Sequence, residues 1–356
     1  MLAAVVCAED KRKSPEVIRF RDVGNTLPAT ASYRWRIYFV GRPYVRADGR
    51  NEKAPILAGI AVDGRQNVYV AEGEKQTIAR ITPKGETTTI AGSPGSPGSE
   101  DGKGSSARFS NPQGLALDGS GDLYVSDRGN HTIRKITSAG VVTTFAGSAG
   151  QAGYVDGLGR DARFSAPGGI ALDSNGTLFV SANAVIRKIT DDGVVSTLPG
   201  WTSGDKSLRL YGTIGGLAVD SEGSVYAAGY MHQQILKVTP DGVTAPVAGV
   251  NERISVVVDG PRSIARFMRP TGVATDVQGN VYMADGMCIR RMTSEGTVTT
   301  IGVKSDFSGH DKGAAARFDK PRGVAVSTTD VIYVTCQDCI IQGVPIGKPG
   351  DSPERP

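Results

Sequence analysis

The fold is decided by residues Asn111 to Ser165, which read NPQGLALDGSGDLYVSDRGNHTIRKITSAGVVTTFAGSAGQAGYVDGLGRDARFS. This stretch contains four short runs rich in apolar, β-branched and aromatic residues, namely GLALD, DLYVSD, TIRKIT and VVTTFAG. Gly, Asp, Asn and Ser residues separate the runs, a pattern typical of short strands joined by tight turns. A four-stranded sheet of this size cannot cover both of its faces alone, so it must stack on similar neighbours.

Similar neighbours occur along most of the chain. The first run recurs at intervals of 47 to 56 residues, and its six copies end at Asp63, Asp118, Asp173, Asp220, Asp276 and Ser327. Because the Asp residues stand at the strand ends, we expect them to form the turns that follow. Six all-β copies at this spacing predict a six-bladed β-propeller whose blades are four-stranded antiparallel sheets.

The two ends of the repeat complement each other. Residues Arg36 to Val40 show a lone fourth-strand pattern ahead of the first full copy, whereas the last copy, Val324 to Ile346, supplies only three strands. We therefore expect the N-terminal strand to pair into the last blade and close the ring, which removes exposed sheet edges. The chain then divides into an N-terminal arm (1–32), the propeller (33–347) and a polar, Pro-rich tail (348–356) that we expect to be disordered.

A second motif recurs in the linkers between blades. It reads DGKGSSARF, DGLGRDARF, DGPRSIARF and HDKGAAARF at residues 101–109, 156–164, 259–267 and 310–318. On these linkers and the repeated strands, the chain resembles the NHL-repeat β-propellers, in the subtype whose linkers read D-G-x-G-x-x-A-R-F. The resemblance implies the propeller fold and leaves the function open, because one fold hosts many unrelated activities.

The linker motif itself is interpreted as structural. Its members are Asp101, Asp156 and Asp259, then Arg108, Arg163, Arg266 and Arg317, then Phe109, Phe164, Phe267 and Phe318. We expect each Arg to bind an acidic group or linker carbonyls at its own blade junction, because its planar fork carries five donors. We expect each Phe to fill space between blades. An anion-binding ring of arginines is the alternative.

The bulk composition narrows the function classes. The 356 residues carry a net charge of +4 with mixed signs, far from the focused basic surface of a dedicated nucleic-acid binder. Met1 to Ala8 (MLAAVVCA) resembles the end of a secretory segment without its basic start, and an untethered N-terminus is the alternative. No later run approaches the ~20 apolar residues that span a bilayer, so we expect a soluble protein, cytosolic or exported.

Enzymatic propellers set a test for the inner strands. The gluconolactonase and paraoxonase families hold a cation with carboxylates and amides at the ligand face, because hard cations prefer oxygen ligands. The matching positions precede the repeated Gly and hold Ala58, Gln113, Gly168, Gly215, Thr271 and Arg322. None is a carboxylate, which argues against this kind of metal site, and we expect no cofactor.

Histidines and cysteines could still bind a metal. A catalytic zinc of the amidating-lyase kind would need His131, His232 and His310, which fall on loops of different blades and are interpreted as solvated residues. Cys288, Cys336 and Cys339 could join His310 in a structural zinc site between the last two blades. The alternatives for these cysteines are a redox pair, a local disulfide or small buried side chains.

The third linker departs most from the repeat. Its residues Trp201 and Tyr211 have no equivalents in other blades. With Tyr230 and Met231 of the next blade they could build an apolar contact patch on the face that carries the linkers, with Gln113 and Arg322 nearby at the channel mouth. Alternatively, Trp201 replaces the missing linker Phe.

Three function classes remain open. The first is a non-catalytic binding or scaffold propeller that presents its linker-face loops to a protein, peptide or glycan. The second is a lyase or hydrolase with a metal-assisted site at the channel mouth. The third is an RNA-binding NHL domain, which would need clustered basic residues with stacking aromatics. Basic third-strand residues such as Arg134, Arg187 and Arg290 are interpreted instead as spread around the rim, so nucleic acid is not the expected partner.

Overall fold

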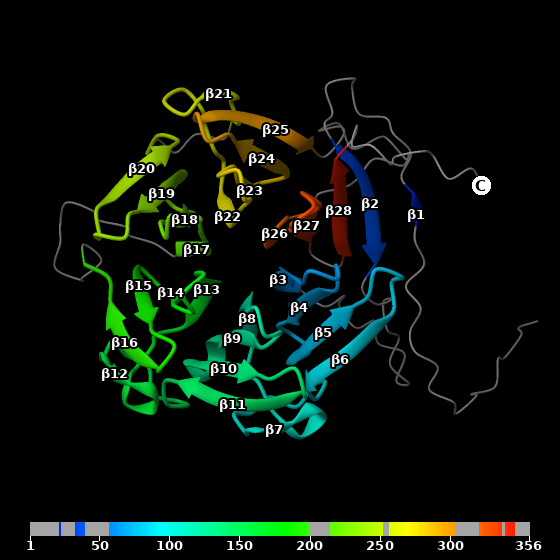
Figure 1. Cartoon of the computed structure of the whole chain (residues 1–356), viewed down its shortest axis with the longest axis vertical. Coiled ribbons are helices and arrows are strands. Elements are labelled where there is room, and N and C mark those ends of the chain that lie inside the picture. The colour runs from blue at the N-terminus through cyan, green and yellow to red at the C-terminus, as the bar shows by residue number, and fades with distance from the viewer. Residues whose placement is uncertain are drawn as a thin grey trace, which may run out of the picture.

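The computed structural model describes residues 21–22, 33–39, 57–199, 214–251, 256–303, 320–336 and 339–345. Within these ranges, six antiparallel sheets surround a central channel (Figure 1). The chain is therefore an all-β, six-bladed propeller, as the repeat predicted. Helix in the described part is confined to 3-10 turns at Gly104–Ser106, Arg128–Asn130 and Gly159–Asp161. None of these helical segments is long and apolar enough to cross a membrane.

Each blade runs from an inner strand at the channel to outer strands at the rim. The inner strands are β3 (Leu57–Val62), β8 (Pro112–Leu117), β13 (Pro167–Leu172), β17 (Ile214–Val219), β22 (Pro270–Thr275) and β26 (Val324–Val326). The second strands are β4 (Val68–Glu72), β9 (Leu123–Asp127), β14 (Leu178–Ala182), β18 (Val225–Gly229), β23 (Val281–Asp285) and β27 (Ile332–Thr335). The third strands are β5 (Thr77–Ile81), β10 (Thr132–Ile136), β15 (Val185–Ile189), β19 (Gln234–Val238), β24 (Cys288–Met292) and β28 (Cys339–Pro345).

The fourth strands and their edges differ between blades. Blades one to five use β6 (Thr87–Gly92), β11 (Val141–Ala146), β16 (Val194–Thr197), β20 (Thr244–Ala248) and β25 (Thr297–Val303). Linker residues add a short fifth strand to blades two, three and five, namely β7 (Gly102–Lys103), β12 (Gly157–Leu158) and β21 (Gly260–Pro261). The prediction of uniformly four-stranded blades was therefore wrong, because two-residue strands inside a Gly-containing linker leave no alternating pattern to read.

An N-terminal strand pairs with the last blade. Strand β2 (Tyr33–Phe39) lies antiparallel to β28, with Tyr33 opposite Pro345 and Phe39 opposite Cys339. Strand β1 (Arg21–Asp22) pairs in turn with the outer side of β2. On the channel side, β26 of blade six contacts β3 of blade one, so the inner strands form a complete circle (Figure 1).

Aspartates at the inner-strand ends hold the first hairpin of the blades. In blade two, Asp118 Oδ1 accepts hydrogen bonds from the backbone N–H groups of Ser120 and Asp122, both at 2.9 Å. The same pair of bonds recurs at Asp63, Asp173, Asp220 and Asp276. The turn-forming role predicted for these residues is confirmed, and it places them on the face opposite the linkers.

The repeated inner-strand glycines let neighbouring blades approach closely. A Cβ at Gly114 would lie 2.3 Å from the carbonyl oxygen of Gly168, and one at Gly59 would lie 2.2 Å from that of Gln113. The contact from Gly323 back to Ala58 O, at 2.8 Å, continues the series from blade six to blade one. Glycine is required here because a side chain would push adjacent inner strands apart.

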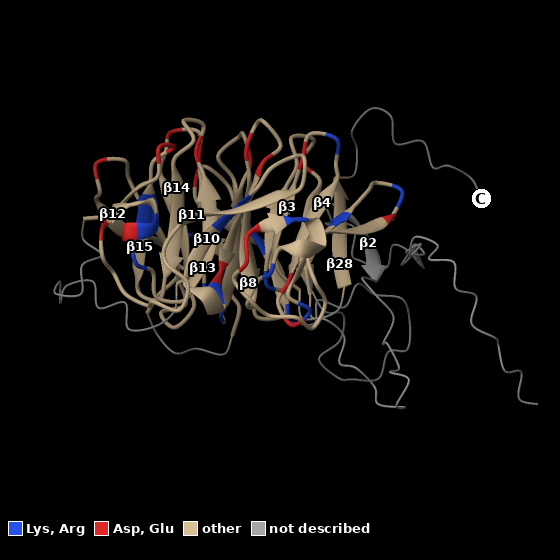
Figure 2. Cartoon of the chain, turned by 90° about the horizontal axis from the view of Figure 1, so that it is seen from below, with Lys and Arg blue, Asp and Glu red and all other residues tan. Residues whose placement is uncertain are grey.

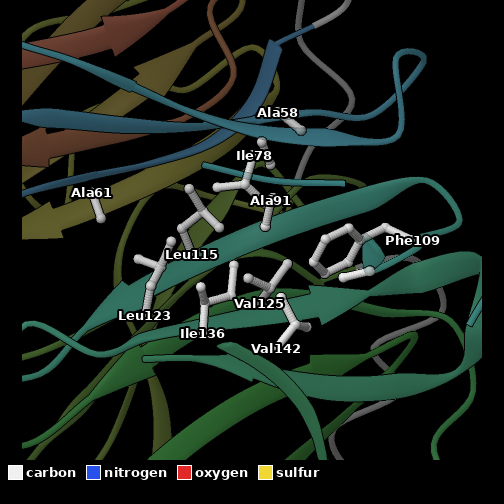
Figure 3. Close-up of a cluster of buried hydrophobic side chains, with 12 residues drawn as sticks. Ala58, Ala61, Ile78, Ala91, Phe109, Leu115, Leu123, Val125, Ile136 and Val142 are labelled. Carbon is white, nitrogen blue, oxygen red and sulfur yellow. The ribbon is translucent and has the colours of Figure 1, made fainter. Parts of the chain in front are cut away.

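The hydrophobic core is divided into clusters between adjacent blades. One cluster joins Ile78 and Ala91 of blade one to Val125 and Ile136 of blade two. Phe109 of the intervening linker is fully buried in this cluster and points among these side chains (Figure 3). Phe164 and Phe267 are buried in the equivalent clusters of later junctions. Phe318 lies outside the described residues.

Candidate functional site

A cavity of about 1180 Å³ occupies the channel mouth. The starts of the inner strands and the loops between second and third strands line it, so it opens on the linker face. All six positions that precede the repeated Gly contribute to its wall: Ala58, Gln113, Gly168, Gly215, Thr271 and Arg322. The cavity therefore lies where the inner strands reach the linker face, which is the place the sequence analysis tested for a ligand site.

The wall is cationic in its described part. Arg128 comes from the loop after β9, Arg269 from the segment before β22, and Lys320 and Arg322 from the segment before β26. Among the described lining residues there is no Asp, Glu, His or Cys. Arg269, Lys320 and Arg322 are exposed and Arg128 is half-buried, so all four remain accessible from solvent.

Tyrosine and methionine side chains border the same cavity on blades four and five. Tyr230 and Met231 come from the loop after β18, and Met231 is 46% exposed. The guanidinium of Arg269 lies over the Tyr230 ring at 5.8 Å from its centre. Gln233 donates from Nε2 to the carbonyl of Met268 at 2.6 Å, which connects the two blades beneath this sector.

The structure brings together four of the residues that the sequence proposed for partner contact. Gln113, Tyr230, Met231 and Arg322 all border the cavity. Trp201 and Tyr211, the other two, lie outside the described residues. The sequence prediction counted Arg128 among basic residues spread around the rim and did not name Arg269, Lys320, Met268 or Met287. Each lies in a loop or linker whose path depends on the folded ring.

The described histidines do not gather at the channel. His131 Nδ1 accepts a hydrogen bond from the backbone N–H of Ala166 at 3.0 Å, so it supports the next linker. This contact corrects its interpretation as a solvated loop residue. His232 is only partly exposed. Its Nε2 atom is buried and has no hydrogen-bond partner among the described residues. His310 lies outside the described residues.

The proposed zinc ligands are buried thiols. Cys288, Cys336 and Cys339 are each at most 6% exposed, and Cys336 and Cys339 pack in one apolar cluster. Cys288 Sγ donates to the carbonyl of Asp285 at 3.0 Å, and burial raises the pKa of this thiol to about 12. In this structure Cys288 is therefore a buried thiol that is hydrogen-bonded to its own loop. No three metal-binding side chains come together in the part of the chain that the structure describes.

The linkers are fixed by buried arginines that sequence reasoning placed on the rim. Arg134 of β10 is fully buried, and its Nη2 donates to Asp101 Oδ1 of the linker at 2.8 Å. Thr144 of β11 donates to the same carboxylate oxygen at 2.9 Å. We call such a set, a third-strand Arg, a linker Asp and a fourth-strand Thr, a linker cluster. Blades three and five repeat it with Arg187, Asp156 and Thr197, and with Arg290, Asp259 and Thr300.

Each linker cluster also holds the linker's backbone and its Phe. Arg134 donates to the carbonyls of Glu100 and Arg108, at 3.0 and 2.8 Å, and lies 5.2 Å from the centre of the Phe109 ring. The linker arginines have a separate role, since Arg108 and Arg163 donate to carbonyls of their own linkers. Arg266 does the same to Ile264 O and Ala265 O. Arg317 lies outside the described residues.

Blades two and five add a second, buried carboxylate to the linker cluster. Asp127 at the end of β9 is fully buried and binds Arg134 Nη1 through Oδ2 at 3.0 Å. Its Oδ1 accepts from the backbone N–H of Ser110 at 2.7 Å. Burial raises the pKa of Asp127 to about 6, against hydrogen bonds from Asn130 and Ser110 and the charge of Arg134. Burial likewise raises the pKa of Asp285.

A signal in the sequence could have revealed these clusters. Blades two, three and five have both the linker Asp and the third-strand Arg. Blade six has His310 in place of the linker Asp and Ile341 in place of the third-strand Arg. The two residues are therefore kept or lost together, which indicates a direct contact.

Comparison with known proteins identifies the repeat. Residues 109–136 match the family model described as NHL repeat. Protein SUPPRESSOR OF QUENCHING 1, chloroplastic, of Arabidopsis thaliana is 33% identical over 35% of this chain and 13% of its own length. NHL repeat-containing protein 2 of Bos taurus is 28% identical over 38% of this chain and 21% of its own. These matches support an NHL-repeat family. The matched part of this chain covers only about a fifth or less of the length of these relatives.

Solved structures share the fold at low sequence identity. A structural genomics protein from Bacteroides thetaiotaomicron has a TM-score of 0.63 at 20% identity, over 83% of this chain and 71% of that one. Streptogramin B lyase has a TM-score of 0.58 at 14% identity, covering 88% and 98%. A gluconolactonase from Xanthomonas campestris also has 0.58, at 12% identity, covering 93% and 95%. At these identities the likeness describes the fold alone.

Proposed function

We propose that this NHL-repeat propeller is a binding protein that holds a peptide segment of a partner at the channel mouth. The observation that supports this most is the convergence of residues from nine separate segments on one open cavity of about 1180 Å³. That volume exceeds the roughly 300–1,000 Å³ of most small-molecule pockets, so it suits several residues of an extended chain.

The character of the wall favours binding. Cations, amides, a tyrosine and methionines surround the cavity, and such side chains are adaptable contacts at interfaces. The described wall offers no carboxylate or imidazole for general acid–base chemistry. Tyr230 and Lys320 are the described lining residues that could take part in such chemistry.

The remaining parts of the chain support the binding face. We propose that the D-G-x-G-x-x-A-R-F linkers are a structural signature whose Asp residues act through the linker clusters. We also propose that β2 closes the ring as the fourth strand of blade six, within a propeller domain spanning 33–347. Both features would keep the loops of the mouth in fixed positions.

A peptide-selection experiment tests the proposed function. Random 12-residue peptides displayed on phage would be selected on the purified protein, and the enriched peptides measured by isothermal titration calorimetry. The double variant Tyr230→Ala/Met231→Ala should weaken them about tenfold or more, because exposed anchors at an interface carry much of the affinity. The control Val243→Ala changes a 60% exposed side chain on the opposite face of the same blade and should leave affinity unchanged.

The same preparation distinguishes an enzyme. Lyase and gluconolactonase propellers share this fold, so a panel of lactones and cyclic peptides would be incubated with the protein and divalent cations. Metal-dependent turnover that EDTA abolishes would replace the binding proposal by an enzymatic one. The binding proposal would also be contradicted if the Tyr230→Ala/Met231→Ala variant bound every selected peptide with unchanged affinity.

A further inference from the structure

We infer that the channel mouth accepts an acidic peptide segment, with carboxylates against its cations and an apolar side chain against its methionines. This inference rests on the proposed binding function and specifies the class of ligand. It combines three features of the wall: the excess of positive charge, the methionine sector and a glycine-rich sector.

The cations of the mouth have no acidic partner within the described part of the chain. In the described structure, none of Arg128, Arg269, Lys320 and Arg322 makes an ion pair. Asp127 and Asp285, which end the second strands of blades two and five, are fully buried and bound to Arg134 and Arg290. Asp319 and Asp338 lie outside the described residues. Because a concave site with low-dielectric walls strengthens the field of its charges, the mouth should attract anions.

A methionine sector lies beside these cations. Met231, Met268 and Met287 line the cavity on blades four and five, which is half of the six methionines in the chain. Thioether side chains are flexible and polarisable, so they adapt to apolar side chains of different shapes. A ligand that is only charged would leave this sector unused, whereas a peptide with alternating acidic and apolar residues would satisfy both.

A third sector is rich in glycine and can accommodate backbone. In blades three and four, Gly168 and Gly215 precede the repeated Gly169 and Gly216, where blades two, five and six carry Gln113, Thr271 and Arg322. An extended chain can approach main-chain groups closely only where such side chains are missing. This sector therefore offers room for the peptide backbone.

Single-stranded RNA fits the wall less well. Proteins that bind it combine basic residues with several aromatic rings on which bases stack. Tyr230 is the one aromatic residue in the described lining, and the Arg269 guanidinium already covers its ring at 5.8 Å. The basic residues that might have extended a track, Arg134, Arg187 and Arg290, are fully buried.

Defined peptides test the ligand class. Fluorescein-labelled ten-residue peptides that alternate Glu with Leu, Gln with Leu, and Lys with Leu would be titrated by fluorescence anisotropy at several salt concentrations. We expect the Glu peptide to bind about tenfold or more tightly than the Gln peptide at low salt, with the advantage falling as salt rises. The Lys peptide should bind weakest.

Charge-reversal variants locate the binding. The variant Arg269→Glu/Arg322→Glu should weaken the Glu peptide at least about tenfold and remove most of its salt dependence. The control Arg65→Glu/Lys84→Glu makes the same charge change at exposed positions in hairpins of the opposite face and should leave the affinity within about twofold. Circular dichroism and thermal unfolding would show that both variants are folded.

Three outcomes would overturn the inference. Equal binding of the Glu and Gln peptides would show that the ligand is a peptide of another kind. Equal effects of the two double variants would show that the Glu peptide does not bind at the mouth. A 12-nucleotide single-stranded RNA that displaces the Glu peptide with higher affinity at physiological salt would make RNA the ligand. Phage selection tests the proposed function separately. If it yields no peptide whose binding depends on Tyr230 and Met231, the proposed function fails, whereas the defined peptides test only the acidic class of ligand.

Discussion

The guanidinium of Arg134 ties three separate segments of the chain to one point. It binds the linker carboxylate of Asp101, the strand-end carboxylate of Asp127 and two linker carbonyls while itself fully buried. A buried ion of this kind is costly to desolvate, and its many hydrogen bonds offset that cost. Arg187 makes the same linker contacts, but blade three has Ala182 where blade two has Asp127. The two blades therefore form a natural comparison.

The first prediction uses this comparison. Arg134→Met should lower the free energy of unfolding by about 3–5 kcal/mol, because it leaves the Asp127 carboxylate buried without its cation. Arg187→Met should cost less, about 1–3 kcal/mol, because Asp156 is 54% exposed and can be solvated by water. Urea unfolding at neutral pH measures both values. Equal losses would show that the second carboxylate contributes nothing to the linker cluster.

The second prediction concerns pH. Because burial raises the pKa of Asp127 to about 6, above the ordinary value of 3.8, the folded state binds a proton more readily than the unfolded state between these values. This site should therefore make the protein less stable as pH rises from about 4 to about 6. Asp127→Asn should lose that dependence, whatever its absolute stability. Unfolding free energies of both proteins at half-unit pH steps give the difference, and parallel curves would contradict the prediction.

The buried arginines mark a limit of sequence reasoning at this scale. Arginine is mostly exposed in proteins, so a position such as Arg134 in an alternating strand is naturally assigned to solvent. The structure reverses this because the preceding linker folds back over the third strand, a path that no local pattern specifies. The joint loss of linker Asp and strand Arg in blade six was the available signal. It required comparing the repeats with one another.

At the level of elements, the strands were well predicted because their signals are local. The Asp turns and β-branched runs located β8, β9, β10 and β11 to within a few residues. The edge strands β7, β12 and β21 were missed, since their pairing depends on the linker lying along the fourth strand. The repeated glycine was visible in every inner strand, but its reason, contact with the next blade's carbonyl, is a property of the packed ring.

The third prediction tests that contact. In Gly114→Ala, the new Cβ would lie 2.3 Å from the carbonyl oxygen of Gly168, so blades two and three must separate. We expect a loss of about 1–3 kcal/mol in unfolding free energy, as for other overpacked sites. Gly119→Ala in the adjacent hairpin is the control, because nothing lies within 4 Å of its added Cβ. The stabilities of both variants would be measured by chemical denaturation. Equal stability would contradict the predicted steric contact between blades two and three.

At the scale of the whole molecule, charge is distributed unevenly between the two faces. The hairpins between inner and second strands carry Asp63, Asp118, Asp173, Asp220 and Asp276, and Figure 2 shows acidic residues gathered on loops along one face of the disc. The cavity on the linker face has cations and no described acidic lining. The sequence indicated several site residues because they break the repeat, but their convergence on one mouth emerges only from the closed ring.

Ring closure gives the last prediction. The two sides of the β2 backbone are both paired, since Ile37 lies opposite Ile341 of β28 and Arg21 of β1. The backbone N–H of Ile37 therefore donates either toward β28 or toward β1. Ile37→Pro must remove that hydrogen bond and also distort the strand. If β2 is the fourth strand that closes blade six, this variant should lose at least about 2 kcal/mol of stability, and the β28 amides should exchange faster with deuterium. Ile37→Val keeps the N–H and the strand preference and should behave like the parent. Unchanged protection of β28 in Ile37→Pro would mean that the circle is held by the inner-strand contact of β26 with β3 alone.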